Sequence, residues 1–223
     1  MENLLNKIHH ADCFEFMDKI PDKSIDLILT DPPYGIGWQS GRRIKKYKKI
    51  ENDNNLHWLH SFMNKVKRIL KDDGCIYVFC SWHNVDIFKS EIQKLIPVKN
   101  ILIWNKNNFG SGDLYADYAP KYEMIIFCNP KRKYLNGKRI PNVLNFKKTR
   151  NEFCPTQKPI DLFETLIEKT TNKGDIVFDP FSGSGVTAIA AYNLKRQFIC
   201  VEKDYDYYKK SNERFLLNNL KKI

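Results

Sequence analysis

The chain has 223 residues, of which 42% are apolar and 13% aromatic, so it has enough core-forming side chains to exclude a disordered chain. No apolar run approaches the roughly 18 residues that cross a bilayer, and the first residues show no secretory signal peptide. The six cysteines include no C-x-x-C pair. We therefore expect a reduced, soluble, cytoplasmic protein that forms a single domain over residues 1–223 and holds no metal.

The net charge of +11 is concentrated in two segments. Residues 42–49 contain six basic side chains and residues 131–150 contain eight, and neither segment contains an acid. The remaining 195 residues carry a net charge of −3. Basic side chains on loops are most often only solvated. Concentrated charge without compensating acids nevertheless favours a polyanion, with nucleic acid as the first candidate.

Short apolar runs separated by helix-length segments predict an α/β fold with a doubly wound, mostly parallel seven-stranded sheet. In chain order the predicted strands are the weaker candidate 8–11, then 25–30, 75–80, 101–104, 124–128, 176–178 and 198–201. The predicted helices are 56–70, 84–95, one that starts at Pro159 and ends before Gly174, and one from the cap Asp204 to about Leu220. No helical pattern separates 101–104 from 124–128, which indicates one antiparallel hairpin at the sheet edge.

A glycine-rich turn lies between the predicted strand 176–178 and a helical segment. Residues 183–188 (GSGVTA) match G-x-G-x-x-[GA], and Glu202 ends the next strand about 20 residues later. Such a turn lets a cofactor approach the backbone, and the acid can accept bonds from ribose hydroxyls. The order of elements predicts an adenosine-type cofactor. Taken alone, the motif fits a nicotinamide cofactor equally well, and a tight turn without ligand is the simpler alternative.

A second motif, Asp31-Pro32-Pro33-Tyr34, directly follows the predicted strand 25–30. Ligands of open α/β sheets bind beyond the carboxyl ends of the strands. The two prolines have no N–H donors, so the Asp31 carboxylate and the carbonyl oxygens remain as acceptors beside the Tyr34 ring. This arrangement suits a planar group that carries an NH₂. A rigid turn with a buried aromatic ring is the alternative.

Together the two motifs resemble those of the β group of amino-group DNA methyltransferases. In that family DPPY binds the target amine, and F-x-G-x-G, here residues 181–185, binds S-adenosylmethionine. Residues 11–13 (ADC), 156–159 (TQKP) and 201–202 (VE) also look like family motifs, so the resemblance covers nearly the whole chain. It implies the Rossmann-like methyltransferase fold and direct methyl transfer to the N6 amine of a flipped adenine in double-stranded DNA. The Asp that opens the motif favours adenine over cytosine N4.

The resemblance and the basic segments imply three sets of site residues. The expected catalytic residues are Asp31, Pro32, Pro33 and Tyr34. The expected cofactor-binding residues are Asp12, Cys13, Asp31, Lys158, Asp179, Phe181, Gly183, Ser184, Gly185 and Glu202. The expected DNA contacts, in a basic loop over about 36–55 and a short target-recognition segment over about 130–153, are Arg42, Arg43, Lys131, Arg132, Arg139 and Arg150.

Three features depart from the family pattern. Cys154 stands where His is common, Val186 stands where Thr is common, and the recognition segment is short. The recognition sequence therefore cannot be inferred. The resemblance also suggests a cognate restriction endonuclease and a monomer or homodimer. The open alternatives are a cytosine-N4 methyltransferase, a non-catalytic nucleic-acid-binding module and a nicotinamide-dependent oxidoreductase.

Overall fold

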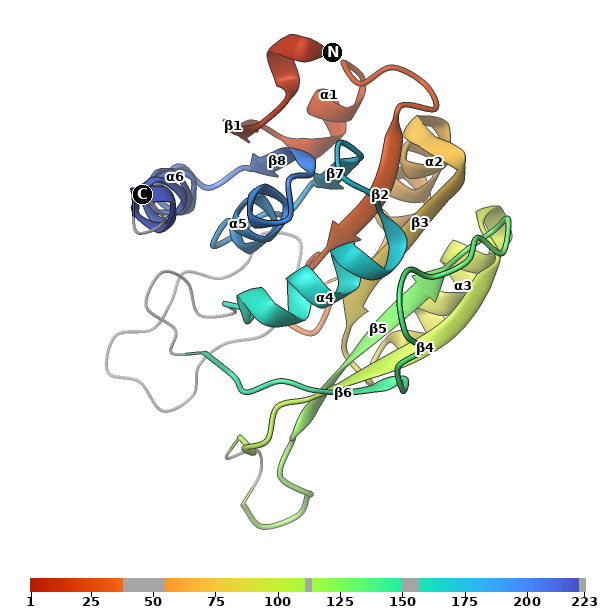
Figure 1. Cartoon of the computed structure of the whole chain (residues 1–223). Helices are drawn as coiled ribbons and strands as arrows, with labels where there is room; N and C mark the ends of the chain where they lie inside the picture. Colours follow the sequence, from red (N-terminus) through yellow and green to blue (C-terminus); the bar gives the residue numbers. More distant parts are fainter. Residues whose placement is uncertain (38–54, 111–113, 150–156, 221–223) are drawn as a thin grey trace.

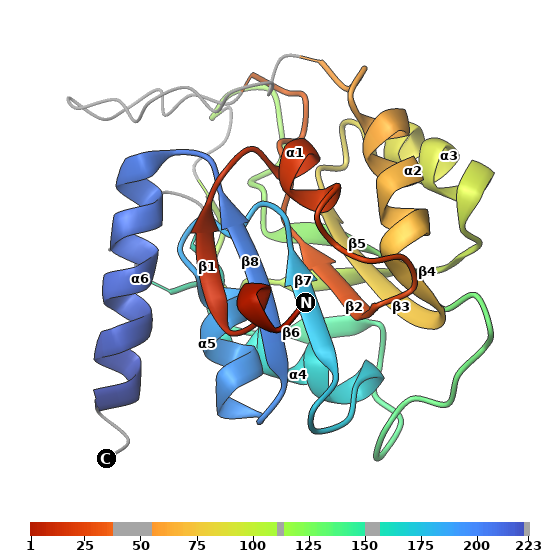
Figure 2. The ribbon, with the colours of Figure 1, turned by 90° about the horizontal axis from the view of Figure 1, so that it is seen from above.

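A sheet between two layers of helices forms the centre of the computed structural model, which describes residues 1–37, 55–110, 114–149 and 157–220 (Figures 1 and 2). Within these residues the sheet has eight strands in the order β1-β8-β7-β2-β3-β5-β4-β6. Neighbouring strands are parallel except where β5 pairs with β3 and β4. The strands are β1 (Lys7–His10), β2 (Ile25–Thr30), β3 (Leu70–Cys80), β4 (Val98–Asn105), β5 (Tyr122–Cys128), β6 (Val143–Asn145), β7 (Ile176–Asp179) and β8 (Gln197–Glu202).

Helices cover both faces of the sheet. They are the short 3₁₀ helix Glu2–Leu4, α1 (Cys13–Met17), α2 (Leu59–Ile69), α3 (Val85–Leu95), α4 (Ile160–Thr170), α5 (Val186–Asn193) and α6 (Tyr205–Leu220). Helices α1 to α3 pack on one face and α4 to α6 on the other, each around its own apolar cluster (Figure 2). Because both faces are covered, every residue of β2 is buried. In the described part of the chain, no helix has the length and apolar character needed to span a bilayer.

The predicted fold class is confirmed, and the sheet has one strand more than expected. Strand β6 has three residues, of which only Leu144 is buried, so its pattern is too short to be recognised in the sequence. The predicted cap Asp204 is confirmed, since its carboxylate accepts hydrogen bonds from two backbone N–H groups of the first turn of α6. Pro159 precedes the first residue of α4 instead of being that residue.

The strand order places four carboxylates along one edge of the sheet. The adjacent parallel strands β1, β8, β7 and β2 all end at this edge. Glu202 and Asp179 are the last residues of β8 and β7, Asp31 directly follows β2, and Asp12 lies two residues beyond β1. Both sequence motifs therefore meet at what we call the carboxyl edge. A ligand of the sheet is expected to bind at this edge.

Candidate active site

The Asp31 carboxylate is held by two neighbours at the carboxyl edge. The Tyr34 hydroxyl donates to Asp31 Oδ1 at 2.5 Å, and Lys158 Nζ donates to Asp31 Oδ2 at 2.5 Å. Burial raises the pKa of Asp31 above its usual value, although Lys158 acts in the opposite direction. Burial and the neighbouring carboxylates raise the pKa of Tyr34 well above its ordinary value, so its hydroxyl stays a donor. The sequence motif thus forms a preorganised hydrogen-bonded unit.

Glu123 and Lys106, which sequence reasoning missed, extend this unit. Glu123 Oε2 lies 3.2 Å from Lys158 Nζ and 3.2 Å from the Tyr34 hydroxyl oxygen. Its other oxygen, Oε1, lies 2.7 Å from Lys106 Nζ. Burial alone would raise the pKa of Glu123, but Lys158 and Lys106 outweigh burial and lower it to about 2. The sequence signal that could have indicated Glu123 is its position directly before the predicted strand 124–128.

The carboxylates of Asp31 and Glu123 therefore differ in pKa, although both contact Tyr34 and Lys158. Among the described residues, Glu123 faces two lysines and remains an anion, whereas Asp31 pairs with Lys158 alone and has the higher pKa. Paired groups with separated pKa values usually divide the acid–base roles of a site. Asp31 is the member of the pair that is suited to accept a proton or a hydrogen bond from a ligand.

The turn after the motif is held in place by a hydrogen bond to the backbone carbonyl of Tyr34. Asn84 Nδ2, from the residue before α3, donates to the Tyr34 carbonyl at 2.8 Å. The following Gly35 has a φ of 73°, a conformation that glycine adopts without strain. The Tyr34 ring is partly buried. One aromatic face of the motif is thus held in a fixed position beside Asp31.

The glycine turn joins β7 to α5 and is tied to the end of β8. The Gly183 N–H donates to Glu202 Oε2 at 2.9 Å, and the Asp204 N–H donates to Oε1 at 2.8 Å. Burial raises the pKa of Glu202 above its usual value. Each carboxylate oxygen keeps a second lone pair. The carboxylate is therefore positioned to accept bonds from two ribose hydroxyls.

Gly185 is required at its position for two reasons. Its φ is 72°, and a Cβ built there would lie 3.0 Å from Ser211 Cβ of α6. Ser184 is held by Arg214 of α6, whose Nη1 donates to the Ser184 Oγ at 2.8 Å and to the Ser184 carbonyl at 3.0 Å. The Ser184 side chain thus contacts the protein, and its role toward a cofactor stays a prediction.

Asp179 lies inside the turn. It accepts a hydrogen bond from the Thr187 hydroxyl at 2.5 Å and another from the Phe181 N–H at 3.1 Å. Burial raises its pKa to about 7. The Phe181 ring packs against Trp58 and Phe62 at centroid distances of 5.7 and 5.6 Å. Both side chains shape the turn from within, and direct cofactor contact by either stays a prediction.

Asp12 and Cys13 lie beside the end of β8. Asp12 caps α1 by accepting from the Phe14 N–H at 2.8 Å, and its other oxygen lies 3.5 Å from Lys203 Nζ. The Cys13 thiol is buried, and burial raises its pKa to about 12. Asp12 is thus placed near Glu202, whereas Cys13 packs in the core.

These residues fit an adenosine-type cofactor with a positively charged centre. The turn offers backbone N–H groups at the start of α5, Glu202 offers ribose acceptors, and the carboxyl edge carries several carboxylates. The Ser182 hydroxyl in the same turn is buried and has no hydrogen-bond partner among the residues that the structure describes.

The structure does not bring the three predicted DNA contacts that it describes to the carboxyl edge. Lys131, Arg132 and Arg139 are exposed, but they follow β5, which runs antiparallel to β3 and ends opposite Ile76, away from the carboxyl end of β3. The segment that follows β5 therefore leads to the opposite edge of the sheet, on the right in Figure 1. Arg42, Arg43 and Arg150 lie outside the described residues.

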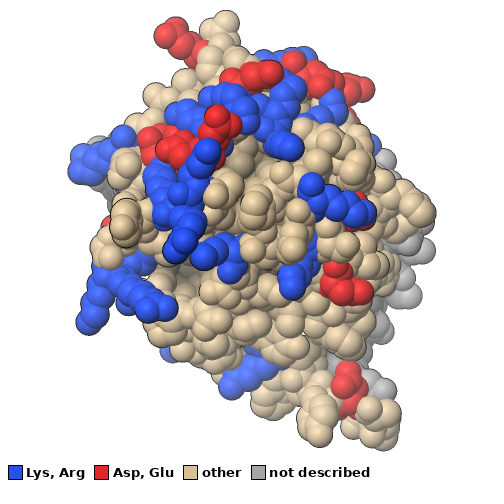
Figure 3. Space-filling model, turned by 90° about the vertical axis from the view of Figure 1, so that its right-hand side faces the viewer, with Lys and Arg blue, Asp and Glu red and all other residues tan. Residues whose placement is uncertain are grey.

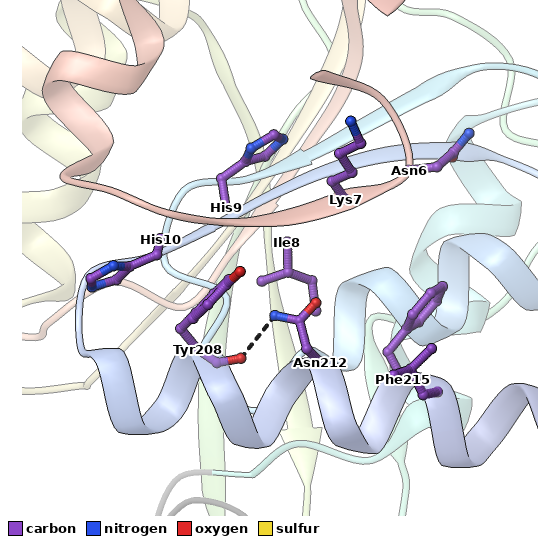
Figure 4. Close-up of a pocket in the computed structure, with 9 residues that line it drawn as sticks. Asn6, Lys7, Ile8, His9, His10, Tyr208, Asn212 and Phe215 are labelled. Atoms are coloured by element: carbon purple, nitrogen blue, oxygen red, sulfur yellow. Dashed lines mark hydrogen bonds between the residues drawn. The ribbon is translucent and has the colours of Figure 1, made fainter. Parts of the chain in front are cut away.

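An open groove of about 550 Å³ lies between β1 and α6 (Figure 4). Ile8 points from the strand toward the helix, where Asn212 Nδ2 donates to the Tyr208 carbonyl at 2.9 Å. None of the predicted site residues lines this groove. We therefore do not assign the predicted chemistry to it.

Comparison with known proteins agrees with this geometry. The model of the DNA methylase family (N6_N4_Mtase) matches residues 25–213. The chain is 30% identical to the type II methyltransferase M2.MboI of Moraxella bovis (93% of this chain, 86% of the relative). It is also 30% identical to the DNA adenine methyltransferase YhdJ of Escherichia coli K12 (93% and 81%).

Two solved structures are similar to the fold. The M1.HpyAVI–SAM complex matches with a TM-score of 0.73 at 27% identity, over 94% of this chain and 98% of that one. The cytosine-N4-specific PvuII methyltransferase matches with a TM-score of 0.77 at 19% identity, over 94% and 86%, which shows the shared fold. The chain therefore belongs to the N6/N4 DNA methylase family of S-adenosylmethionine-dependent methyltransferases.

Proposed function

We propose that this protein transfers the methyl group of S-adenosylmethionine to the N6 amine of a flipped adenine in double-stranded DNA. One observation carries the proposal: a partly buried Asp31, bound by Tyr34 and Lys158, lies at the same sheet edge as the glycine turn and Glu202. A carboxylate acceptor, a planar ring and a nucleotide-type turn are the parts that direct methyl transfer to an amine requires.

S-adenosylmethionine supplies an electrophilic methyl group at this site. Asp31 and the Pro32 carbonyl accept hydrogen bonds from the two amine hydrogens and so draw the nitrogen lone pair out of conjugation with the base. Tyr34 stacks on the flipped base. Asp31 then takes the proton that the methylated nitrogen loses, while Glu123 stays ionised and holds Lys158 in place. No covalent intermediate between enzyme and base is needed.

Adenine is favoured over cytosine N4 for two reasons. The motif opens with Asp31, whereas cytosine-N4 members of the family more often open it with Ser. The relative YhdJ, which matches 93% of this chain, is named a DNA adenine methyltransferase. The similarity to the PvuII enzyme at 19% identity concerns the fold and gives no support for cytosine.

Partners of the protein follow from the same family membership. Relatives named type II methyltransferases, such as M2.MboI, support a cognate restriction endonuclease. The endonuclease partner and the choice between monomer and homodimer stay predictions.

Expression in a host without DNA methylation, followed by long-read sequencing, tests the proposal. We expect N6-methyladenine at one short sequence and none with the matched variant Asp31→Ala. Calorimetry should show that this variant still binds S-adenosylmethionine, because Glu202 and the glycine turn are unchanged. A genome without modified bases, or a fully active Asp31→Ala variant, would contradict the proposal.

A further inference from the structure

Large apolar side chains are exposed at the end of the hairpin that joins β4 to β5. We define the hairpin end as residues 106–110 and 114–121. Phe109 is 71% exposed, Tyr115 97% and Tyr118 94%. Single exposed apolar residues are common on protein surfaces, but a cluster of aromatic rings on one short hairpin indicates a binding surface.

The hairpin end begins beside the residues that hold Asp31, where we propose that the target amine binds. Its first residue, Lys106, pairs with Glu123, which in turn contacts Lys158 and Tyr34. In Figure 1 the described part of the hairpin extends beyond the labelled strands at the bottom of the view. A polymeric substrate with one group bound at Asp31 can therefore reach the hairpin end.

Between Lys106 and Lys121, the described residues of the hairpin end are mostly polar or aromatic, and Asp117 is the one charged residue among them. Asn107 and Asn108 are exposed amides, and the exposed acid Asp117 accepts a hydrogen bond from the Tyr118 N–H at 2.7 Å. In Figure 3 the lower part of the surface is mostly uncharged, whereas Lys and Arg gather higher on the same face. In a groove of duplex DNA, amides hydrogen-bond to base edges and aromatic rings make apolar contacts with base edges such as the thymine methyl group, whereas phosphate contacts require cations.

The dimensions of the hairpin end suit a groove of duplex DNA. Its two limbs are joined by backbone hydrogen bonds, from Lys106 N to Lys121 O at 3.0 Å and from Gly110 N to Pro120 O at 2.8 Å. Paired strands lie about 5 Å apart, and a two-stranded ribbon fits the major groove, which is about 12 Å wide.

We propose that the hairpin end enters a groove of the DNA beside the target adenine and contributes to sequence recognition. This inference rests on the proposed function. Phe109, Tyr115 and Tyr118 contact bases, and the amides of Asn107 and Asn108 bind base edges. The hairpin end thereby supplements the short segment 130–153.

Lysines at the base of the hairpin end supply the phosphate contacts. Lys121 and Lys147 are exposed. Strand β6 runs beside β4, and the Phe146 N–H donates to the Asn105 carbonyl at 3.2 Å, so Lys147 lies at the carboxyl edge. These lysines lie at the same edge of the sheet as Asp31, in contrast to Lys131 and Arg132 at the opposite edge.

The triple variant Phe109→Ser/Tyr115→Ser/Tyr118→Ser tests the proposal, with Lys131→Gln/Arg132→Gln/Lys133→Gln as the contrast. Anisotropy of labelled, unmethylated plasmid fragments gives the DNA affinity from about 50 to 300 mM salt. We expect the aromatic variant to bind about tenfold more weakly at each salt concentration with an unchanged salt slope, because contacts with base edges release no counterions. Long-read sequencing should also show methylation at a wider set of sequences.

Calorimetric binding of S-adenosylmethionine to the variant, at the wild-type affinity, shows that the fold is intact. Wild-type DNA affinity and methylated sequence in the aromatic variant would overturn the proposal. A loss that occurs only in the basic contrast variant would place the DNA at segment 131–150. A shift from dimer to monomer in light scattering would identify a second copy as the partner and would also overturn it. A wild-type protein that neither binds nor methylates DNA refutes the proposed function itself.

Discussion

Replacing the buried Lys158 by Met removes the positive charge between two partly buried carboxylates and keeps a long, unbranched side chain. Lys158 Nζ lies 2.5 Å from Asp31 and 3.2 Å from Glu123. Because the Tyr34 hydroxyl is 2.5 Å from an oxygen of the first and 3.2 Å from an oxygen of the second, these oxygens are at most about 5.7 Å apart. At that separation two unit charges repel by about 3 kcal/mol at an effective dielectric constant near 20. We expect the free energy of unfolding to fall by about this amount.

The same variant should change the pH dependence of methyl transfer. Lys158 lowers the pKa of Asp31, so its removal raises that pKa, and the ionised form appears only at higher pH. The acid limb of the rate profile should move to higher pH, with activity lost at neutral pH and partly recovered in alkaline buffer. The loss of stability should vanish at low pH, where Asp31 is protonated. Affinity for S-adenosylmethionine should stay unchanged.

A double variant, Lys158→Met/Glu123→Gln, controls for general damage to the core. It removes the repulsion together with the cation, so urea unfolding should recover most of the lost stability. If Lys158→Met instead keeps the wild-type stability and pH profile but binds S-adenosylmethionine weakly, Lys158 contacts the cofactor, as the family resemblance implied, and our reasoning is refuted.

Three further predictions concern the turn at β7. Glu202→Gln should weaken the binding of S-adenosylmethionine about tenfold in calorimetry, because the amide presents an N–H donor to the Gly183 N–H. An unchanged affinity would contradict the assignment of Glu202 to the ribose. Gly185→Ala should lower stability to urea by about 1–3 kcal/mol, since its φ is 72° and the new Cβ lies 3.0 Å from Ser211, and a wild-type midpoint would contradict this. Asp179 has its pKa raised from 3.8 to about 7, so the stability of the ligand-free protein should fall by up to roughly 4 kcal/mol as pH rises between these values. Asp179→Asn should lack that fall, and identical pH curves for both proteins would refute the assignment.

The sequence predicts the strands and helices of this fold more completely than it predicts which strands lie side by side in the sheet. Strand β2 is apolar at four of its six positions because both of its faces are buried, and the motif at its end marks the carboxyl edge. The hairpin of β4 and β5 could be predicted because no helical pattern separates the two strands. Its order in the sheet could not, because no local pattern shows that β5 lies between β3 and β4.

That one feature of the strand order accounts for the main differences at the site. It brings Glu123 to Tyr34, which is 89 residues away in the chain, so no motif connects them. It also sends the chain after β5 to the far edge of the sheet, which separates Lys131 and Arg132 from Asp31. The pairing of Gly183 with Glu202, in contrast, depends on a strand–turn–helix–strand unit that is continuous in the sequence.

Mass spectrometry of nucleosides tests the central claim most directly. Unmethylated DNA is incubated with the purified protein and S-adenosylmethionine that carries a deuterated methyl group, and then digested. We predict deuterated N6-methyladenine as the modified nucleoside. Deuterated N4-methylcytosine would keep the mechanism but contradict the adenine assignment, and DNA without deuterated methyl groups would contradict the account as a whole.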